Sequence, residues 1–228
     1  METLMNMIGR GAQRRRSRAP RPSGADREKA IVSTLRALLD HKNIYDISIG
    51  DLVQAAGITR QGFYFYFASK EAALVSLFGQ VLDEVVEDYK ARIDQLESDD
   101  PVVVWRNSIG VPLATILRNR NVFLAANQMR EASPEIRRVW DGMIEYWVDR
   151  AARRIRAEQQ RGAAPSDISP EELAMSLNLM NERATLAVCA NSGPRHDASE
   201  LTEALLRVWI RSIYLTTRPV FFSECPPA

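Results

Sequence analysis

The segment SIGDLVQAAGITRQGFYFYFASK, residues 48–70, constrains the fold most, because it predicts two short helices joined by a tight turn. Ser48 is followed three residues later by Asp51, the spacing of a helix cap and an acidic group in the first turn. Gly57 stands where that helix must end, since glycine enters left-handed backbone geometry without a steric penalty. Thr59 can cap the second helix. The pattern predicts a helix-turn-helix unit near the N-terminus.

The second helix of this unit combines an apolar face with polar and aromatic side chains. Phe63 and Phe67 lie four residues apart, so we expect both to face inward. Arg and Gln can distinguish base edges in the DNA major groove, while Thr, Tyr and Lys suit phosphates. Ser69 can cap the next helix, whose first residue is cationic. The candidate DNA contacts of the segment are Ser48, Thr59, Arg60, Gln61, Tyr64, Tyr66 and Lys70.

Two helices around a glycine turn also occur in many all-helical proteins for packing alone. The longer run GITRQGFYFYFASKEAAL resembles the signature of TetR-family transcriptional regulators: a Gly-Ile/Val-Ser/Thr turn, an aromatic-rich recognition helix and a Phe-x-x-Lys-Glu/Asp entry to the fourth helix. The resemblance implies an all-α fold of about nine helices. It further implies an N-terminal three-helix helix-turn-helix domain and a larger C-terminal helical domain for effector binding and dimerisation.

Charge is distributed unevenly, although the net charge is only +1. Residues 1–70 contain 12 Lys or Arg and 6 Asp or Glu, whereas residues 71–228 contain 18 and 23. A basic head suits DNA, because phosphate neutralisation supplies most sequence-independent affinity. Arg14, Arg15 and Arg16 lie among Gly, Ala, Ser and Pro, a composition that predicts a disordered arm on the DNA backbone or in a minor groove. A solvated tail without DNA contacts is the alternative.

Beyond residue 70 the sequence predicts successive helices and no strand. Asp-Pro at 100–101 and Ser-Pro at 133–134 and 169–170 each place a capping side chain before a proline at the first helical position. Apolar residues recur at helical spacing over about 70–97, 101–118, 121–131, 134–161, 170–191 and 198–217. Pro112 is expected to kink or break its helix. We expect a disordered arm (1–22), a DNA-binding head (23–70), a helical body (71–218) and a flexible tail (219–228).

All four tryptophans lie in the predicted body. Trp140 and Trp147 are seven residues apart and share a helix face, as do Asn178 and Asn181, which are three apart. Large aromatic walls with a few convergent amides are what a small-molecule pocket requires. Aromatic side chains at helical spacing more often form a core or a dimer interface, so the residues alone leave both interpretations open.

Further motifs resemble one group of ligand-binding repressors within the same family, over most of the chain. They are RPSGADREKAI, DISIGDL, FYFYFASKEA, RGAAP, ELAMSLNLMNER and VWIRSIY. The resemblance implies a long, largely hydrophobic tunnel through the body. By matching positions, the tunnel is expected to be lined by Trp105, Trp147, Trp209, Asn178, Asn181 and Glu182, with Trp140, Met143 and Ile144 near its mouth or wall. The chain departs from this group at Pro112 and Ala151, which puts the tunnel's shape in question.

The expected partners are double-stranded operator DNA, a hydrophobic small-molecule effector and a second copy bound through the last two helices, about 170–191 and 198–217. Leu177, Leu205 and Val208 supply apolar surface there, either for the dimer or for the monomer's own core. We therefore predict a repressor released from operator DNA by its effector. The alternative is an architectural DNA-binding protein without an effector.

Other classes have little support in the sequence. We expect no enzyme activity, because there is no Gly-rich phosphate loop, nucleophile elbow or metal cluster. Cys189, Cys225, His41 and His196 have no metal-ligand spacing, so no metal or cofactor is expected. Reduced cysteines, no secretory signal and no apolar run near the ~20 residues of a membrane span predict a cytoplasmic protein. A redox switch at the cysteines is the alternative.

Overall fold

The computed structural model describes residues 24–98, 100–191 and 198–214. Their helices are α1 (Gly24–Leu39), α2 (Ile49–Ala56), α3 (Arg60–Tyr66), α4 (Lys70–Asp94), α5 (Pro101–Arg118), α6 (Arg120–Met129), α7 (Pro134–Gln160), α8 (Pro170–Cys189) and α9 (Ala198–Tyr214). A short 3-10 helix, η1 (Ile44–Asp46), lies between α1 and α2. These residues form nine α-helices and no strand, which confirms the all-α fold.

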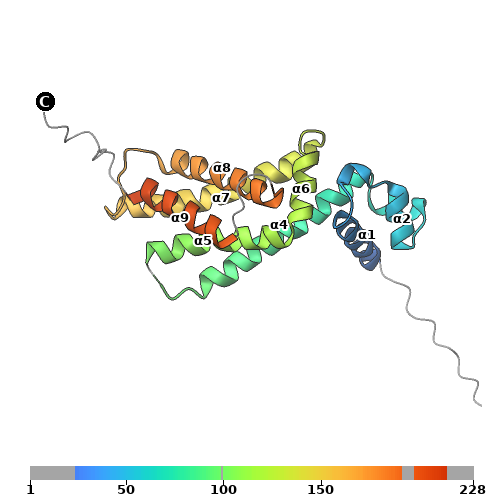
Figure 1. The fold of residues 1–228 in the computed structure, drawn as a ribbon, viewed down its shortest axis with the longest axis horizontal. Coiled ribbons are helices and arrows are strands. Elements are labelled where there is room, and N and C mark those ends of the chain that lie inside the picture. Colours follow the sequence, from blue (N-terminus) through green and yellow to red (C-terminus); the bar gives the residue numbers. More distant parts are fainter. Residues whose placement is uncertain (1–23, 99, 192–197, 215–228) are drawn as a thin grey trace, which may run out of the picture.

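The helices form a small head at one end of an elongated molecule and a larger body at the other (Figure 1). Helices α1 to α3 make the head, and α5 to α9 gather in the body. Helix α4 belongs to both, because its 25 residues pack against α1 in the head and against α5, α6 and α7 in the body. One continuous helix therefore connects the two parts.

Side-chain caps fix the ends of the head helices. The Ser48 hydroxyl accepts the Asp51 amide hydrogen at 3.1 Å, and the Asp51 carboxylate accepts the Ser48 amide hydrogen at 2.8 Å. This capping box also lowers the pKa of Asp51, chiefly through the Ser48 hydroxyl. Gly57 ends α2 at φ 64° and ψ 33°, the left-handed geometry that favours glycine. The sequence-based prediction of a turn at Gly57 is confirmed.

Three body helices begin, as predicted, at a proline that follows a capping residue. Side chains of Asp100, Ser133 and Ser169 accept hydrogen bonds from the first turns of α5, α7 and α8. Helix α4 ends at Asp94, three residues earlier than the sequence pattern indicated. Helix α5 continues through Pro112 without a break. A helix-interior proline costs about 3 kcal/mol, but Ile109, Leu113 and other apolar side chains of α5 are buried and each contributes about 1.5–3 kcal/mol.

Two hydrophobic clusters fill the molecule. The first runs without interruption from the head, through Leu74 and Phe78 on α4, to Phe123 on α6 and Trp140 on α7. The second joins α5, α7, α8 and α9 around Trp105 and other residues. The head therefore has no separate core that ends where α4 begins.

The outer surface of α8 and α9 differs in detail from the sequence-based expectation. Leu177 and Leu205 are buried in the second cluster, so they close the monomer's own core. Met175 and Leu179 on α8 and Val208 on α9 are instead exposed. These three are the large hydrophobic side chains classed as exposed on the described α8 and α9.

Candidate DNA-binding surface and ligand cavity

Helix α3 presents polar and aromatic side chains to solvent from one side of the head. Arg60, Gln61 and Tyr64 are exposed, and Phe63 on the opposite side is fully buried. The Thr59 hydroxyl caps α3 by accepting the Gly62 amide hydrogen at 3.0 Å. Thr59, Arg60, Gln61 and Tyr64 thus form an accessible surface around the helix N-terminus, where backbone amides and the helix dipole favour phosphate.

Three predicted DNA contacts have structural roles of their own. Tyr66 is half-buried and packs against the first cluster. The Ser48 hydroxyl is engaged in the capping box. The Lys70 ammonium donates to the carbonyl oxygens of Ile44 and Ile47 at 2.6 and 2.7 Å. Lys70 therefore joins α4 to η1 and the residue that follows it, and these contacts use two of its three N–H donors.

The α3 surface also contains a residue that sequence reasoning missed. Phe65 is 80% exposed, more than any other large hydrophobic side chain of the described residues. Its ring centroid lies 5.0 Å from that of Tyr66 in an edge-to-face arrangement. The sequence could have indicated this exposure, because Phe65 lies between Tyr64 and Tyr66 and away from the inward helix face of Phe63 and Phe67.

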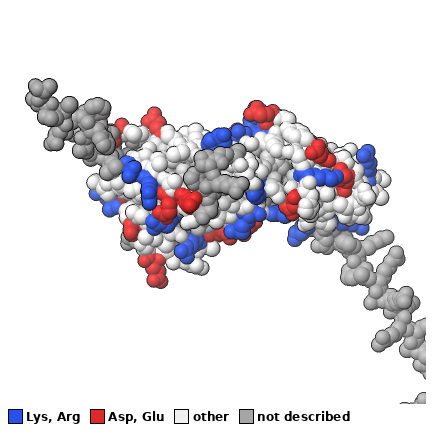
Figure 2. Space-filling model, viewed as in Figure 1, with Lys and Arg blue, Asp and Glu red and all other residues white. Residues whose placement is uncertain are grey.

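The folded head is nearly neutral. Residues 24–70 contain six Lys or Arg and five Asp or Glu, and residues 1–23 contain six arginines and one glutamate. Figure 2 shows positive and negative side chains interspersed over the visible face of head and body. The predicted contacts Arg14, Arg15 and Arg16 lie outside the described residues. The positive charge of the N-terminal region therefore comes mainly from residues before α1.

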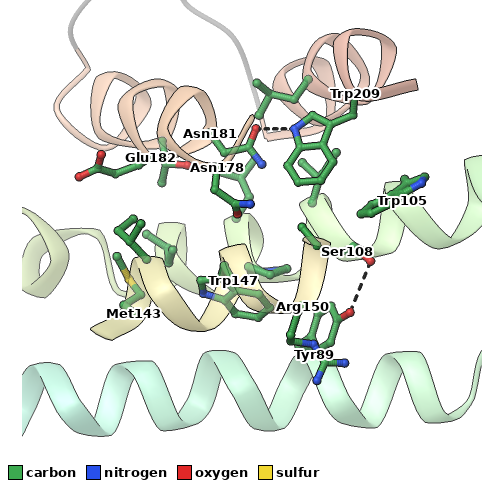
Figure 3. Close-up of a pocket in the computed structure, with 18 of the residues that line it drawn as sticks. Tyr89, Trp105, Ser108, Met143, Trp147, Arg150, Asn178, Asn181, Glu182 and Trp209 are labelled. Carbon is green, nitrogen blue, oxygen red and sulfur yellow. Dashed lines mark hydrogen bonds between the residues drawn. The ribbon is translucent and has the colours of Figure 1, made fainter. Parts of the chain in front are cut away.

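A cavity lies inside the body, lined by residues of α4, α5, α6, α7, α8 and α9 (Figure 3). It provides about 850 Å³ free of protein atoms, its opening to solvent included. Its lining includes the predicted Trp105, Met143, Ile144, Trp147, Asn178, Asn181, Glu182 and Trp209, and also Pro112 and Ala151.

The polar groups of the cavity are held by specific hydrogen bonds. The Asn181 carbonyl oxygen accepts from the Trp209 indole at 3.0 Å, and the Asn178 amide nitrogen donates to the Ala174 carbonyl at 2.8 Å. These two bonds leave the Asn181 side-chain nitrogen and the Asn178 side-chain oxygen unused. The Trp105 indole donates to the Tyr214 hydroxyl at 3.0 Å, outside the lining.

Trp140 was expected near the mouth or wall of the tunnel, and the structure corrects this. It is not among the lining residues, because it is buried in the first cluster, where its ring stacks on Phe78 with centroids 5.5 Å apart. Its indole nitrogen donates to Glu182 at 2.7 Å, and Arg130 donates to the same carboxylate oxygen at 2.8 Å. Trp140 therefore lies outside the cavity and holds the lining residue Glu182 in position.

Sequence reasoning also missed two arginines in the lining, Arg150 and Arg154. They follow Trp147 by three and seven residues, which places them on its helix face. That spacing was a usable signal, because cations on the apolar face of a buried helix are unusual. Tyr89 on α4, Ser108 on α5 and Phe123 on α6 were also missed.

The described residues contain no helix long and apolar enough to cross a membrane, and no group of three or more His, Cys, Asp or Glu that could hold a metal ion. His196 and Cys225 lie outside them. Cys189 is buried, and this burial raises the pKa of its thiol to about 11.

The exposed recognition helix behind a glycine turn defines a transcriptional regulator of the helix-turn-helix class. Residues 31–77 match the family model of bacterial regulatory proteins of the tetR family, and residues 105–215 match that of the C-terminal domain of transcriptional regulator EthR. The chain therefore belongs to the TetR family of bacterial transcriptional regulators, and its body is of the EthR type.

Curated relatives support this assignment over most of the chain. The HTH-type transcriptional regulator EthR of Mycobacterium tuberculosis is 38% identical over 197 residues, which cover 86% of this chain and 91% of that protein. EthR of Mycolicibacterium smegmatis is 38% identical over 205 residues, covering 87% and 91%. These relatives are transcriptional regulators and not enzymes.

Solved structures share the fold at lower identity. A regulator from Saccharomonospora viridis, solved in complex with choline, has a TM-score of 0.67 and 19% identity, covering 82% of this chain and 96% of its own. The fatty acid degradation regulator FadR of Bacillus halodurans has a TM-score of 0.66 and 12% identity, covering 81% and 94%. Both comparisons support the fold alone.

Proposed function

We propose that this protein is a cytoplasmic, homodimeric repressor whose operator binding is released by a hydrophobic small molecule in the body cavity. The observation that carries the proposal is that two helices serve both head and cavity. Helix α4 begins at Lys70, whose ammonium donates a hydrogen bond to η1 in the head. The same helix carries Tyr89, which lines the cavity. Helix α6 carries Phe123 in the lining, and the carbonyl of Gln128 near its end accepts from the Tyr45 hydroxyl of the head at 2.7 Å.

These connections support a mechanism of population shift. A ligand that displaces Phe123 or Tyr89 would move α6 or α4. The head forms hydrogen bonds to both helices. Further bonds join head and body: Asn121 donates to Asp40 at 2.9 Å, and Arg36 donates to Asn119. A ligand with higher affinity for a conformation whose heads are displaced would then lower operator affinity.

In the head, we assign base recognition to Arg60 and Gln61, because both are exposed on the first turn of α3. Thr59 and Tyr64 suit phosphate contacts flanking the groove, and Arg14 to Arg16 suit the DNA backbone or a neighbouring minor groove. Ser48, Tyr66 and Lys70 are assigned mainly to holding this surface in place.

A homodimer would use the outer surface of α8 and α9, where Met175, Leu179 and Val208 are exposed. Two heads related by a two-fold axis would read two half-sites one helical turn apart. One seven-residue recognition helix contacts few base pairs, so pairing raises specificity. The cavity favours this regulator over an architectural DNA-binding protein, which needs no hollow body.

The first experiment is selection of fragmented genomic DNA by the purified protein, followed by sequencing. A few palindromic sites would support a local regulator, whereas broad retention without a motif would favour the architectural alternative. The selected site then serves for fluorescence anisotropy, with decanol and decanoate as effector probes. Binding of either probe in the cavity without any loss of operator affinity would refute ligand-released repression.

A matched pair of variants locates the effect in the cavity. Trp147→Ala removes a lining side chain and should abolish the response to the probes, with operator affinity kept. Arg153→Ala, an exposed position on the same helix, should leave both properties unchanged. An equal response of the two variants would place the effector elsewhere.

A further inference from the structure

We infer that the cavity is built for an amphipathic ligand with a carboxylate head, which Arg150 and Arg154 bind while an apolar chain lies along Trp147 and Met143. The inference rests on the proposed function, because it names the chemical class of that effector. It comes from two half-buried arginines of the cavity lining that have buried Nε atoms and no carboxylate partner among the described residues.

Arg150 and Arg154 are one turn apart on α7, and both line the cavity. The Nε atom of each is buried and has no hydrogen-bond partner among the described residues. The guanidinium carbon of Arg150 lies 4.6 Å from the ring centroid of Tyr89, and that of Arg154 lies 5.9 Å from a Trp105 ring. These aromatic faces hold the guanidinium groups in place but do not neutralise them.

Two other arginines of the body are paired with carboxylates that are half-buried or buried. Arg130 forms an ion pair with Glu182 at 2.8 Å, and Arg161 forms one with the buried Glu158. Within the described part of the chain, neither Arg150 nor Arg154 forms such a pair. Each guanidinium is partly withdrawn from water, which is costly for a cation that has no partner. A carboxylate matches the planar fork of a guanidinium and can accept two parallel N–H donors.

The rest of the cavity defines the orientation of the ligand (Figure 3). Glu182 and Met143 lie toward one end, and Arg150 lies beside Tyr89 toward the other. The carboxylate of Glu182 is already paired with Arg130 and gives an anion no favourable contact, so the ligand head is directed to the two unpaired arginines. From Met143 to Arg154 helix α7 rises by about 16 Å, and an extended alkyl chain would run along this length beside the tryptophan wall.

The same arrangement disfavours cationic ligands. The Trp105 and Trp209 ring centroids are 5.1 Å apart, a pairing that could contribute to an aromatic cage. The guanidinium of Arg154 already lies over Trp105, however, and that of Arg150 lies nearby on the same helix face. A quaternary ammonium in the cavity would therefore meet two like charges.

The test is isothermal titration of the full-length protein with three probes of equal chain length: decanoate, decanol and decyltrimethylammonium. We expect decanoate to bind at least tenfold more tightly than decanol, and the ammonium compound to bind weakest. Arg150→Met and Arg154→Met should each reduce the preference for decanoate over decanol several-fold, with decanol affinity kept. Arg153→Met, on the exposed face of the same helix, should keep the full preference.

Thermal denaturation of each variant separates loss of recognition from loss of folding. Should a methionine variant unfold, Arg150→Lys keeps the cation without the bidentate fork, and it should retain only part of the preference for decanoate. Equal binding of decanoate and decanol by the unmodified protein would overturn the inference, and so would methionine variants that keep the preference.

Operator release, measured in parallel, distinguishes this inference from the proposed function. Release by decanol with no advantage for decanoate would support a ligand-released repressor and refute the carboxylate site. Tight, arginine-dependent binding of decanoate without operator release would support the site and refute the regulatory mechanism. Binding of none of the probes in the cavity would overturn the inference, and an operator response to none of them would count against the proposed mechanism.

Discussion

The hydroxyl of Tyr45 donates a hydrogen bond to the carbonyl oxygen of Gln128 at 2.7 Å, joining the head to the end of α6 across 83 residues of sequence. Tyr45 is nevertheless 60% exposed to solvent. A surface tyrosine thus connects η1 in the head with the helix that carries Phe123 in the cavity lining. The residue pattern around Tyr45 gave no sign of this contact, because it depends on how the body helices meet the head.

We predict that Tyr45→Phe weakens the connection between ligand and operator binding. A single exposed hydrogen bond contributes about 0.5–1.5 kcal/mol, so the ratio of operator affinities with and without ligand should change about two- to twelvefold. Ligand affinity measured without DNA should change less. Tyr146→Phe is the matched control, because the Tyr146 hydroxyl is buried without a hydrogen-bond partner in the described structure. Equal effects of the two substitutions would exclude this role for Tyr45.

Lys70 and Arg60 should differ in what they stabilise. Lys70→Met removes two hydrogen bonds from an ammonium to backbone carbonyls, so we expect the free energy of unfolding to fall by about 2–3 kcal/mol. Arg60→Ala should leave stability within about 0.5 kcal/mol, because its side chain is exposed, but should relax the base preference of operator binding. Urea denaturation and anisotropy with mutated operators measure the two effects. A stability loss in both variants would argue against this division.

Deletion of residues 1–22 tests the charge of the N-terminal region. The folded head is nearly neutral, so we expect the deletion to weaken binding to all DNA sequences alike. The slope of log affinity against log salt should become shallower by roughly 0.9 for each arginine that neutralises a phosphate. Replacing Arg14, Arg15 and Arg16 with glutamine provides a milder version. An unchanged slope would identify the segment as a tail without DNA contacts.

The carboxylate of Glu182 should matter for stability as well as for the cavity. Glu182→Gln removes the charge that Arg130 and the Trp140 indole share, and we expect a loss of about 2–4 kcal/mol in unfolding free energy. The control is Glu135→Gln, whose ion pair with Arg138 lies on the surface and should contribute less than about 1 kcal/mol. A small, equal effect in both variants would show that the buried network is dispensable.

Cys189 should be inert in the folded protein. Burial raises the pKa of its thiol from 9.0 to about 11, so little reactive thiolate exists at neutral pH. In a Cys225→Ser background, iodoacetamide should modify Cys189 only after denaturation. Because the unfolded thiol loses its proton at lower pH, stability should decline between pH 9.0 and about 11, and less so in Cys189→Ala. Rapid labelling of the native protein would contradict the buried thiol.

Local signals predicted the head and the helix starts well, since capping, the glycine turn and the inward pair Phe63 and Phe67 depend on neighbouring residues. The cavity was predicted only in part. Its aromatic wall followed from helical spacing and family resemblance, but the sequence pattern could not separate Trp147, which lines it, from Trp140, which packs behind it. That distinction depends on which helices surround each face, a property of the assembled body.

Pro112 was expected to kink or break its helix, and the break does not occur. The helix continues because the burial of its neighbours outweighs one lost hydrogen bond. Arg150 and Arg154 lie on a helix face that also carries the lining residue Trp147, which local rules would assign entirely to the core. Such conflicts between pattern and environment are expected at sites that bind something.

The uninterrupted hydrophobic cluster of head and body limits how modules of this protein can be exchanged. A chimaera cut at residue 70 would pair foreign residues with Leu74, Leu77 and Phe78, whose buried sides face the native head, α6 and α7. New operator specificity is therefore better introduced by replacing exposed side chains of α3 than by transplanting a whole head. The same restriction applies in evolution. The exposed residues of α3 can change one at a time, whereas the buried residues where the head meets α4, α6 and α7 must change together.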